Sequence, residues 1–457
     1  MHDPTTRQSV LFPGLFRKPL IAQFDRPHAS SDGGAVMLKA ADRRLGLIDA
    51  LAACLEDRRQ PGKVVHSLRE LLAQRIFAIA CGYPDANDAA RLADDPIHKL
   101  LLDRDPIHGD PLASQPTLSR FENGVRRGTL YRMAETHFER VLERHGQRLR
   151  KVRHITVDLD PTDDPTHGAQ QLSFFNGHYG HWCYLPVVAF LTFNREPDQY
   201  LAAAVLRPGT APAQLGALPL LKRILRRLQE RFPGARILVR LDGGFAGPEL
   251  FEFLDEVNVD YVVAMAKNAV LERLVEPEMI TARHLADQCG RTAHLYGEVR
   301  YAARKWDRPR RVIFKAEVVR HPGRDPKDNP RFVVTNLTRT PRRLYERIYC
   351  LRGELENRIK ELHHGMEIDR TSCTRFWANQ LRVLLTAAAY LLMQEVRLKA
   401  AHTIWSRAQV GTLREQLIKL GTHVVVSARR IVLHLPASYP FLDAWRRTAC
   451  ALGARAG

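Results

Sequence analysis

Cysteine pairs, long apolar runs and acidic residues are all scarce in this sequence of 457 residues. Its seven cysteines are odd in number, and no two of them form a Cys-x-x-Cys pair. This spacing argues against a disulfide framework and against a structural zinc site, and it favours a reducing compartment.

No apolar run is long enough to suggest a membrane span. The longest, at 381–393, contains Arg382 and is shorter than the roughly 20 residues that cross a bilayer, so it predicts a core helix. Residues 1–14 contain no basic segment followed by an apolar one, and we therefore expect no secretory signal. These absences favour a cytoplasmic protein that does not associate with membranes.

The shortage of acidic residues leaves a large positive charge. Lys and Arg number 69 and Asp and Glu 50, which gives a formal net charge of +19. A field of this size favours a polyanionic partner, although a solvated basic surface is the alternative. The hydrophobic content of 45% is sufficient for several cores, and the length predicts about two to four domains.

Residues 1–150 form the first predicted region, which is helical in its patterning throughout 36–150. Within it, the segment 113–124 turns Arg120 and Asn123 outward if its apolar residues face the core. A DNA-recognition helix and a short connecting helix are both open interpretations of this segment. We expect an all-α DNA-binding region.

Residue 151 begins a different pattern, in which strands precede alternating strands and helices. Strands are predicted at 153–160, 181–193, 198–209, 236–242 and 259–267, with helices at 213–231 and 248–257. This order predicts a mixed sheet with helices covering its faces. Residues 151–267 are therefore the predicted first part of an α/β core.

The rest of the chain is predicted in three parts. Residues 268–337 interrupt the alternation with strand-like runs and turns, which indicates a β-rich insertion. Residues 338–400 return to the core with a long helix at 344–364 and an apolar helix at 377–396. Residues 401–457 form a basic C-terminal region.

Acidic residues stand at strand ends in the predicted core. Alternation places Asp158 and Asp160 on the same face of the first strand, and does not choose between them. Asp242 ends the fourth strand just before two glycines, at the carboxyl edge where α/β sheets commonly bind ligands. Either position alone is also compatible with an ordinary turn cap.

The predicted helix 344–364 carries a stripe of polar residues. Steps of three or four residues place the following side chains on one face: Tyr349, Arg352, Glu356, Lys360 and His363. Such a stripe is unusual for a core and indicates a site. Carboxylates brought together from two strand ends and a helix suit Mg²⁺, and two such ions can catalyse phosphodiester transfer.

Three motifs carry a resemblance to a known family. Asp160-Pro161-Thr162 resembles the Asp-x-Thr motif of insertion-sequence transposases, and 241–256 resembles their second aspartate motif. Tyr349, Arg352 and Glu356 match their Tyr-x₂-Arg-x₃-Glu signature. The wider segments 158–168, 174–180 and 352–362 resemble the IS thirteen-eighty group, and the resemblance extends from Ser31 to the basic strand 427–436.

This resemblance implies a DDE transposase with an RNase H-like fold, in which a β-rich insertion is typical. It implies that Asp160, Asp242 and Glu356 hold two Mg²⁺ ions, for which Mn²⁺ is expected to substitute, and that Tyr349 and Arg352 position DNA. The implied partners are the double-stranded terminal inverted repeats, the target DNA and a second copy of the chain. The implied location is the bacterial cytoplasm, at the nucleoid when DNA is bound.

The family signature ends with a lysine that contacts phosphate, and His363 stands in its place. Lys360, one helical turn after Glu356, is an alternative phosphate contact. The motif and the nearness to the strand end favour Asp160 over Asp158 as the first acid. Two rival functions stay open: a structure-specific nuclease on the same fold, and a silent DNA-binding regulator derived from a transposase.

Trp306 lies among basic residues in the insertion. Two roles are open for it: stacking on a displaced base, and anchoring a small subdomain.

Overall fold

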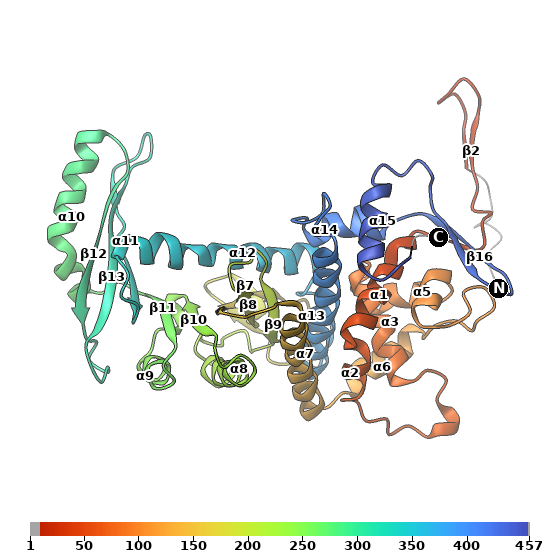
Figure 1. The fold of residues 1–457 in the computed structure, drawn as a ribbon, viewed down its shortest axis with the longest axis horizontal. Coiled ribbons are helices and arrows are strands. Elements are labelled where there is room, and N and C mark those ends of the chain that lie inside the picture. Colours follow the sequence, from red (N-terminus) through yellow and green to blue (C-terminus); the bar gives the residue numbers. More distant parts are fainter. Residues whose placement is uncertain (1–9, 456–457) are drawn as a thin grey trace. The chain divides into compact units, whose positions relative to one another are not determined.

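The computed structural model describes residues 10–455, shown in Figure 1. Contacts divide the chain into two compact units. The first joins the residues up to Ala52, Glu56–Phe121 and the residues from Leu392 onward, and the second comprises Ala53–Leu55 and Glu122–Leu391. Each unit is described by itself.

The first unit is mostly helical, with short strands. Its helices are α1 (Val36–Leu45), α2 (Leu47–Ala52), α3 (Leu68–Ala80), α4 (Ala86–Arg91), α5 (Pro96–Leu101), the start of α6 (Gln115–Gly124), α14 (Val410–Leu413) and α15 (Leu442–Ala451). Strands β1 (Val10–Phe12) and β2 (Leu20–Ala22) pair with each other, and β3 (Ala29–Ser30) joins the sheet β17–β16–β3 with β16 (Thr422–Val426) and β17 (Ile431–His434). The N-terminal region is therefore not all-α, because it contributes strands to two sheets.

A buried aspartate fixes the N-terminal segment to the C-terminal one within this unit. Asp32 is fully buried, and its carboxylate lies 2.8 Å from Lys419 Nζ and 2.8 Å from His98 Nε2. The next residue, Gly33, donates its backbone N–H to the Leu420 carbonyl at 2.9 Å. A Cβ on Gly34 would lie 1.8 Å from the Leu417 carbonyl oxygen, so only glycine permits this approach.

The second unit is built on a nine-stranded sheet with the order β12–β13–β15–β11–β10–β4–β8–β9, and β14 pairs with β13. Its strands are β4 (His154–Pro161), β8 (Val187–Phe193), β9 (Tyr200–Val205), β10 (Arg236–Leu241), β11 (Asp260–Met265), β12 (Ala293–Tyr301), β13 (Arg310–Val319), β14 (Lys327–Asp328) and β15 (Arg331–Thr335). Strands β4, β10 and β11 are parallel, and all other pairs are antiparallel. The mixed α/β sheet predicted from the sequence is confirmed.

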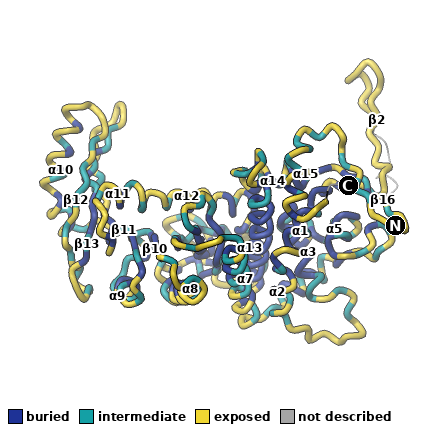
Figure 2. Tube along the Cα trace, viewed as in Figure 1, coloured by how far each residue is buried: buried dark blue, intermediate teal, exposed yellow. Residues whose placement is uncertain are grey.

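Helices cover this sheet. They are α7 (Arg127–Arg148), α8 (Ala217–Arg231), α9 (Pro248–Glu256), α10 (Ala269–Cys289), α11 (Pro341–Leu344), α12 (Gly353–Lys360) and α13 (Phe376–Lys399). Figure 1 shows α8 and α9 on one side of β10 and β11, and the segment from α11 to α12 on the other. Figure 2 shows α13 buried along most of its length, in agreement with the core helix predicted there.

The segment 181–193 was predicted as one strand and is two. Strand β7 (His181–Tyr184) ends before Pro186, and β8 begins directly after it. Proline has no N–H to donate to a sheet, so the ladder breaks there. β7 instead lies in a separate small sheet, β5–β7–β6, with β5 (Asp164–Pro165) and β6 (Phe174–Asn176).

The insertion 268–337 begins with a long helix, which the sequence analysis did not predict. Asn268 caps α10 by accepting from the backbone N–H groups of Val270 and Leu271. The buried side chains of α10 recur at steps of three and four: Leu271, Val275, Met279, Ala282 and Ala286. Its strands extend the main sheet, because β15 pairs with β11.

The compact units do not divide at 150/151, where the sequence analysis placed a boundary. Helix α7 lies in the second unit, because buried histidines on it pack against the sheet. His137 Nε2 lies 2.9 Å from the Leu201 carbonyl oxygen, and the His145 ring stacks on Phe193 at 4.6 Å. Among the helices that the structure describes, none is long and apolar enough to cross a membrane.

Candidate active site

Two parallel neighbours, β4 and β10, bring the first two predicted acids to one edge of the sheet. Asp158 pairs in register with Arg240, so Asp160 and Asp242 each lie two residues further along. Asp242 caps a short 3₁₀ turn, Gly243–Phe245, and accepts from the Gly244 N–H at 2.9 Å. The sequence argument from strand ends therefore placed these two residues at the same edge.

Asp160, the first of the three predicted acids, is largely buried and paired with an arginine. Its side chain is 14% exposed, and its Oδ1 lies 2.6 Å from Arg352 Nη2. The pKa of Asp160 is raised to about 7, mainly by burial and also by the charges of Asp242 and Glu356, while Arg352 acts to lower it. Asp242 and Glu356 are thus both within electrostatic reach of Asp160.

Glu356 comes from an irregular helical segment. Between α11 and α12 lie a π turn, Tyr345–Tyr349, and a 3₁₀ turn, Cys350–Arg352, and a second π turn, Glu361–Gly365, follows α12. The segment is helical as predicted, with wide turns at both ends of the polar stripe. Wide turns of this kind are frequent at functional sites.

Two contacts orient this segment toward the end of β4. Arg352 meets Asp160, and His363 Nε2 lies 2.7 Å from the Thr162 hydroxyl. Glu356 lies between them along the helix and is exposed. The stripe predicted from helical periodicity therefore does face the strand that carries the first acid.

His363 occupies a different environment from the one predicted for a phosphate contact. One ring nitrogen meets Thr162, and the other, Nδ1, lies 3.2 Å from Asp369 Oδ2. Burial acts to raise the pKa of Asp369, but the hydrogen bond from His363 holds it below its usual value. Both nitrogens are thus engaged within the protein, whereas Lys360 is exposed.

Asp158, the alternative first acid, is buried and forms an ion pair with Arg240. Its buried carboxylate accepts from Arg240 Nε at 2.7 Å and Nη2 at 2.6 Å, and from Gln199 at 3.0 Å. Arg240 also donates to the Ile348 carbonyl at 3.0 Å, which ties the sheet to the helical segment. Both oxygens of Asp158 are therefore occupied by partners within the protein, whereas the charges of Asp242 and Glu356 act on Asp160.

Tyr349 and Arg352 line the same region. Tyr349 is half-buried with its ring 5.6 Å from that of Tyr345, and burial raises the pKa of its hydroxyl. The charge of Arg352 opposes this rise and that of Asp242 adds to it. The Nε atom of Arg352 is buried and has no hydrogen-bond partner among residues 10–455. A buried donor of this kind fits an anionic ligand.

The sequence analysis missed one further residue near the acids. Tyr179 lies in the turn between β6 and β7, and its pKa is raised by burial, then by the charges of Asp163 and Asp160 and, more weakly, of Asp242. In the sequence, Tyr179 stands out only as part of the segment 174–180, which resembles the transposase group. Its hydroxyl group therefore lies within electrostatic reach of the site.

The donor set suits a hard divalent cation. Asp160 is paired with Arg352 and is repelled by the charges of Asp242 and Glu356, a repulsion that a bound Mg²⁺ ion would relieve. The oxygen atoms of the three carboxylates are not all within 4.8 Å of one another, since among the described residues only Asp32, Cys81 and His98 meet that condition. Wider spacing is compatible with two ions, which lie about 3.5–4 Å apart in such sites.

The group of Asp32, Cys81 and His98 is better explained without a metal. The 2.8 Å separation of Asp32 and His98 is a hydrogen-bond distance, and Lys419 already balances the charge of Asp32. Lys419 also lies 3.8 Å from the centre of the Tyr83 ring. We interpret this network as structural.

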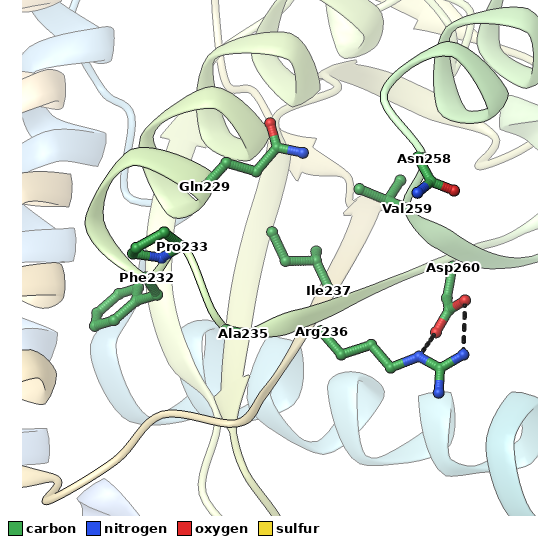
Figure 3. Close-up of a pocket in the computed structure, with 9 residues that line it drawn as sticks. All are labelled: Gln229, Phe232, Pro233, Ala235, Arg236, Ile237, Asn258, Val259 and Asp260. Carbon is green, nitrogen blue, oxygen red and sulfur yellow. Dashed lines mark hydrogen bonds and ion pairs between the residues drawn. The ribbon is translucent and has the colours of Figure 1, made fainter.

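Two other candidates do not form part of the site. The Trp306 ring packs 5.1 Å from Phe251 and 5.6 Å from Tyr301, with Arg310 stacked on it, which supports the anchoring role. A cavity of about 350 Å³, shown in Figure 3, lies where β10 and β11 begin, near the ion pair of Arg236 and Asp260. That is the opposite end of these strands from Asp242.

The comparison with protein families agrees with the motifs. A family model described as "Transposase DDE domain group 1" matches residues 12–454. A piggyBac transposase synaptic complex with hairpin DNA, solved by cryo-EM, is similar at 11% identity with a TM-score of 0.41, covering 84% of this chain and 80% of that chain. A search of curated proteins gives no match. On the match of the family model, the chain belongs to the transposase DDE domain family.

Proposed function

We propose that this protein is a DNA transposase that cuts at the ends of its element and joins them to target DNA. The observation that carries the proposal is the placement of Asp160 and Asp242 at the ends of neighbouring parallel strands, with the charge of Glu356 on α12 acting on Asp160, in a chain of this family. Phosphodiester transfer needs charge stabilisation and positioning more than covalent catalysis, and clustered carboxylates provide the means.

We infer an RNase H-like core in the second unit. Its support is the strand order β9–β8–β4–β10–β11. Strand β8 is antiparallel to both β4 and β9, whereas β10 and β11 run parallel to β4. The first two acids then lie at the carboxyl ends of adjacent strands. The DNA-binding role proposed for the N-terminal region is independent of this inference.

Asp160, Asp242 and Glu356 would hold two Mg²⁺ ions, or Mn²⁺ in their place. When bound, these ions supply the charge that activates the attacking oxygen and stabilises the leaving one. Asp242 is pre-oriented for this role by its bond from the Gly244 N–H. Glu356, on the exposed side of the helix, is the acid most accessible to DNA.

Arg352 is the proposed phosphate-binding residue of the site. It now pairs with Asp160, and its buried Nε has no hydrogen-bond partner in the described structure. A guanidinium group can bind a phosphate through two parallel hydrogen bonds, so DNA entry would draw it away from Asp160. Tyr349 and Lys360 would contact the backbone beside it, whereas His363 would hold Thr162 and the end of β4 in place.

The proposed partners are double-stranded DNA and a second copy of the chain. The net charge of +19 supports DNA binding along the phosphate backbone. Two DNA ends must be brought together before they are joined, which is the reason for proposing a homodimer on DNA. The proposed location is the cytoplasm, at the nucleoid.

The decisive experiment uses purified protein, Mg²⁺ and a plasmid carrying the DNA that flanks the gene on both sides. We expect double-strand cleavage at inverted repeats and transfer of the cut ends to a second plasmid. Cleavage without transfer would identify a nuclease, and specific binding without cleavage would identify a silent regulator. If the protein neither binds nor cleaves this DNA, the proposal is refuted.

A further inference from the structure

The hairpin of β6 and β7 presents two half-exposed aromatic side chains, Phe175 and Trp182. Phe175 and Trp182 stand directly opposite each other in the register of the two strands. Opposite residues share a face and have Cβ atoms roughly 4.5–5.5 Å apart, so both side chains project from the same face of the hairpin. The two residues are 53% and 57% exposed, which is unusual for side chains of this size.

This hairpin is held firmly in place. Asn176 donates to the Gly209 carbonyl at 2.8 Å and accepts from the His178 N–H at 2.9 Å, and Gly180 closes the turn at a φ of +76°. His181 pairs with Asp163 at 3.1 Å. The hairpin is therefore preorganised, which reduces the entropy cost of binding a ligand.

The same hairpin lies beside the candidate active site. Asp163, which pairs with His181 of β7, follows Asp160 by only three residues. Tyr179, in the turn of the hairpin, has its pKa raised in part by the charges of Asp160 and Asp242. Anything bound at the acids therefore has the hairpin as a neighbour.

We propose that Phe175 and Trp182 form a stacking platform for an unpaired base of the DNA strand that enters the carboxylate site. This inference rests on the proposed function, since it takes DNA as the ligand of the acids. Every base has a π face, so an aromatic platform binds unpaired nucleotides with little sequence preference. In this proposal, the strand that is cut and transferred has an unpaired nucleotide near the reacting phosphate.

A protein partner fits this surface less well. Two half-exposed aromatic rings provide at most a few hundred Å², because each side chain buries roughly 150–250 Å² when fully covered. A stable protein interface takes roughly 800 Å² from each side. A flat base matches both the size and the shape of the platform.

The test is a binding measurement that requires no catalysis. The full chain is titrated, in EDTA, with a DNA duplex that has a single-stranded overhang containing 2-aminopurine, and with the matching blunt duplex. Four variants are compared with the wild type: Trp182→Ala, Phe175→Ala, Trp182→Phe and, as a matched control, Tyr131→Ala. Tyr131 is 41% exposed on α7 and has no part in the platform.

We expect wild-type protein to quench the 2-aminopurine fluorescence and to prefer the overhang duplex. Trp182→Ala and Phe175→Ala should weaken overhang binding by roughly 5- to 150-fold, the usual loss when one base–aromatic stack is removed, and leave blunt-duplex binding unchanged. Trp182→Phe and Tyr131→Ala should retain the preference.

Equal affinity of wild-type protein for the two duplexes would overturn the platform, and so would unchanged quenching in the alanine variants. If Trp182→Ala fails to fold, Phe175→Ala still decides the matter. The failure of the proposed function is a separate outcome, because it is detected in the cleavage and transfer assay, which this measurement does not involve.

Discussion

Asp158 and Asp160 lie two residues apart on the same side of one strand, yet their surroundings give them opposite roles. Asp158 is paired with Arg240 on both oxygens and accepts a third bond from Gln199. Asp160 has one cation and two repelling carboxylates around it. Neighbours from other elements, and not the strand itself, make the difference.

This difference predicts opposite effects of the two asparagine substitutions. Asp158→Asn leaves Arg240 buried without a carboxylate, which should cost about 3–5 kcal/mol of unfolding free energy. Asp160→Asn removes a repelled charge and should leave stability unchanged or higher in EDTA, while DNA cleavage is abolished with both Mg²⁺ and Mn²⁺. Urea denaturation and the plasmid assay measure the two effects. The reverse ranking in both assays would make Asp158 the catalytic acid.

A buried histidine makes stability depend on pH. His145 lies between the rings of Phe193 and Tyr200, and burial, then the charges of Arg148 and Arg144, lower its pKa to about 2. The unfolded chain has an ordinary histidine pKa near 6.5. The contribution of the neutral His145 ring to the free energy of unfolding is thus complete above pH 6.5. It is lost as the pH falls below that value, by up to about 1.4 kcal/mol per pH unit.

The variant His145→Gln should therefore show a flatter stability profile than wild type between pH 6.5 and 4.5, measured by urea denaturation at each pH. Exposed His178, changed to Gln, is the matched control and should leave the slope unchanged. Parallel profiles for wild type and His145→Gln would show that His145 is not the group responsible.

At the scale of elements, regular local patterns predicted most of the central sheet. The alternation at 153–160 and the apolar run at 236–242 correspond to β4 and β10, and their strand ends led to Asp160 and Asp242. Prediction was wrong at 181–193, where apolar character continues through a proline that ends the ladder. It also missed α10, whose helical spacing lies in a segment dominated by strand-like runs.

The parts of the site that the sequence did not predict come from contacts between distant segments. His363 meets Thr162 across 201 residues of sequence, and Arg240 meets Asp158 across 82. Periodicity describes one element at a time, so it placed His363 on the correct helical face without indicating its partner. Tyr179 was missed for the same reason, since a turn residue has no pattern that points to a strand end.

Gly209 provides a test of how the β6–β7 hairpin is positioned. A Cβ at this position would lie 2.1 Å from the Cys183 carbonyl oxygen and 2.7 Å from that of Phe174. Gly209→Ala must therefore displace one strand of the hairpin, which should reduce overhang binding and cleavage together and cost roughly 1–3 kcal/mol of stability. Binding, cleavage and thermal denaturation measure these three effects.

Gly177→Ala, in the turn of the same hairpin, is the control, because an added methyl group there meets no atom within 4 Å. We expect it to behave as wild type. Wild-type cleavage by Gly209→Ala would show that the hairpin tolerates displacement and is not needed in its present position.

At the scale of the whole molecule, each compact unit is assembled from segments that are far apart in the chain. The first unit combines the N-terminal helices with the residues from Leu392 onward, and the core of the second is interrupted by the insertion. Sequence analysis divides a chain into consecutive pieces, so it assigned 1–150 and 401–457 to separate regions. Pairing of β3 with β16 shows why these segments belong together.

A fragment of residues 1–150 should therefore not fold by itself. It contains buried Asp32 and its partner His98 but not Lys419, and removing one partner of a buried ion pair costs about 3–5 kcal/mol, a large share of the total stability of a small domain. It also lacks β16, the pairing partner of β3, and the Leu420 carbonyl that accepts from Gly33. We expect no cooperative thermal transition from this fragment by circular dichroism.

The matched comparison is a chain in which a long flexible linker joins residue 121 to residue 392, so that the complete first unit is present. This chain should melt cooperatively. If the N-terminal region binds the terminal repeats, the linked chain should also bind them, with an affinity that falls steeply as salt rises, because binding releases counterions from the DNA. A cooperative transition from 1–150 alone, at the temperature of the linked chain, would show that the C-terminal segment is dispensable for folding. If the linked chain folds but does not prefer repeat DNA, the residues that recognise the repeats lie in the second unit.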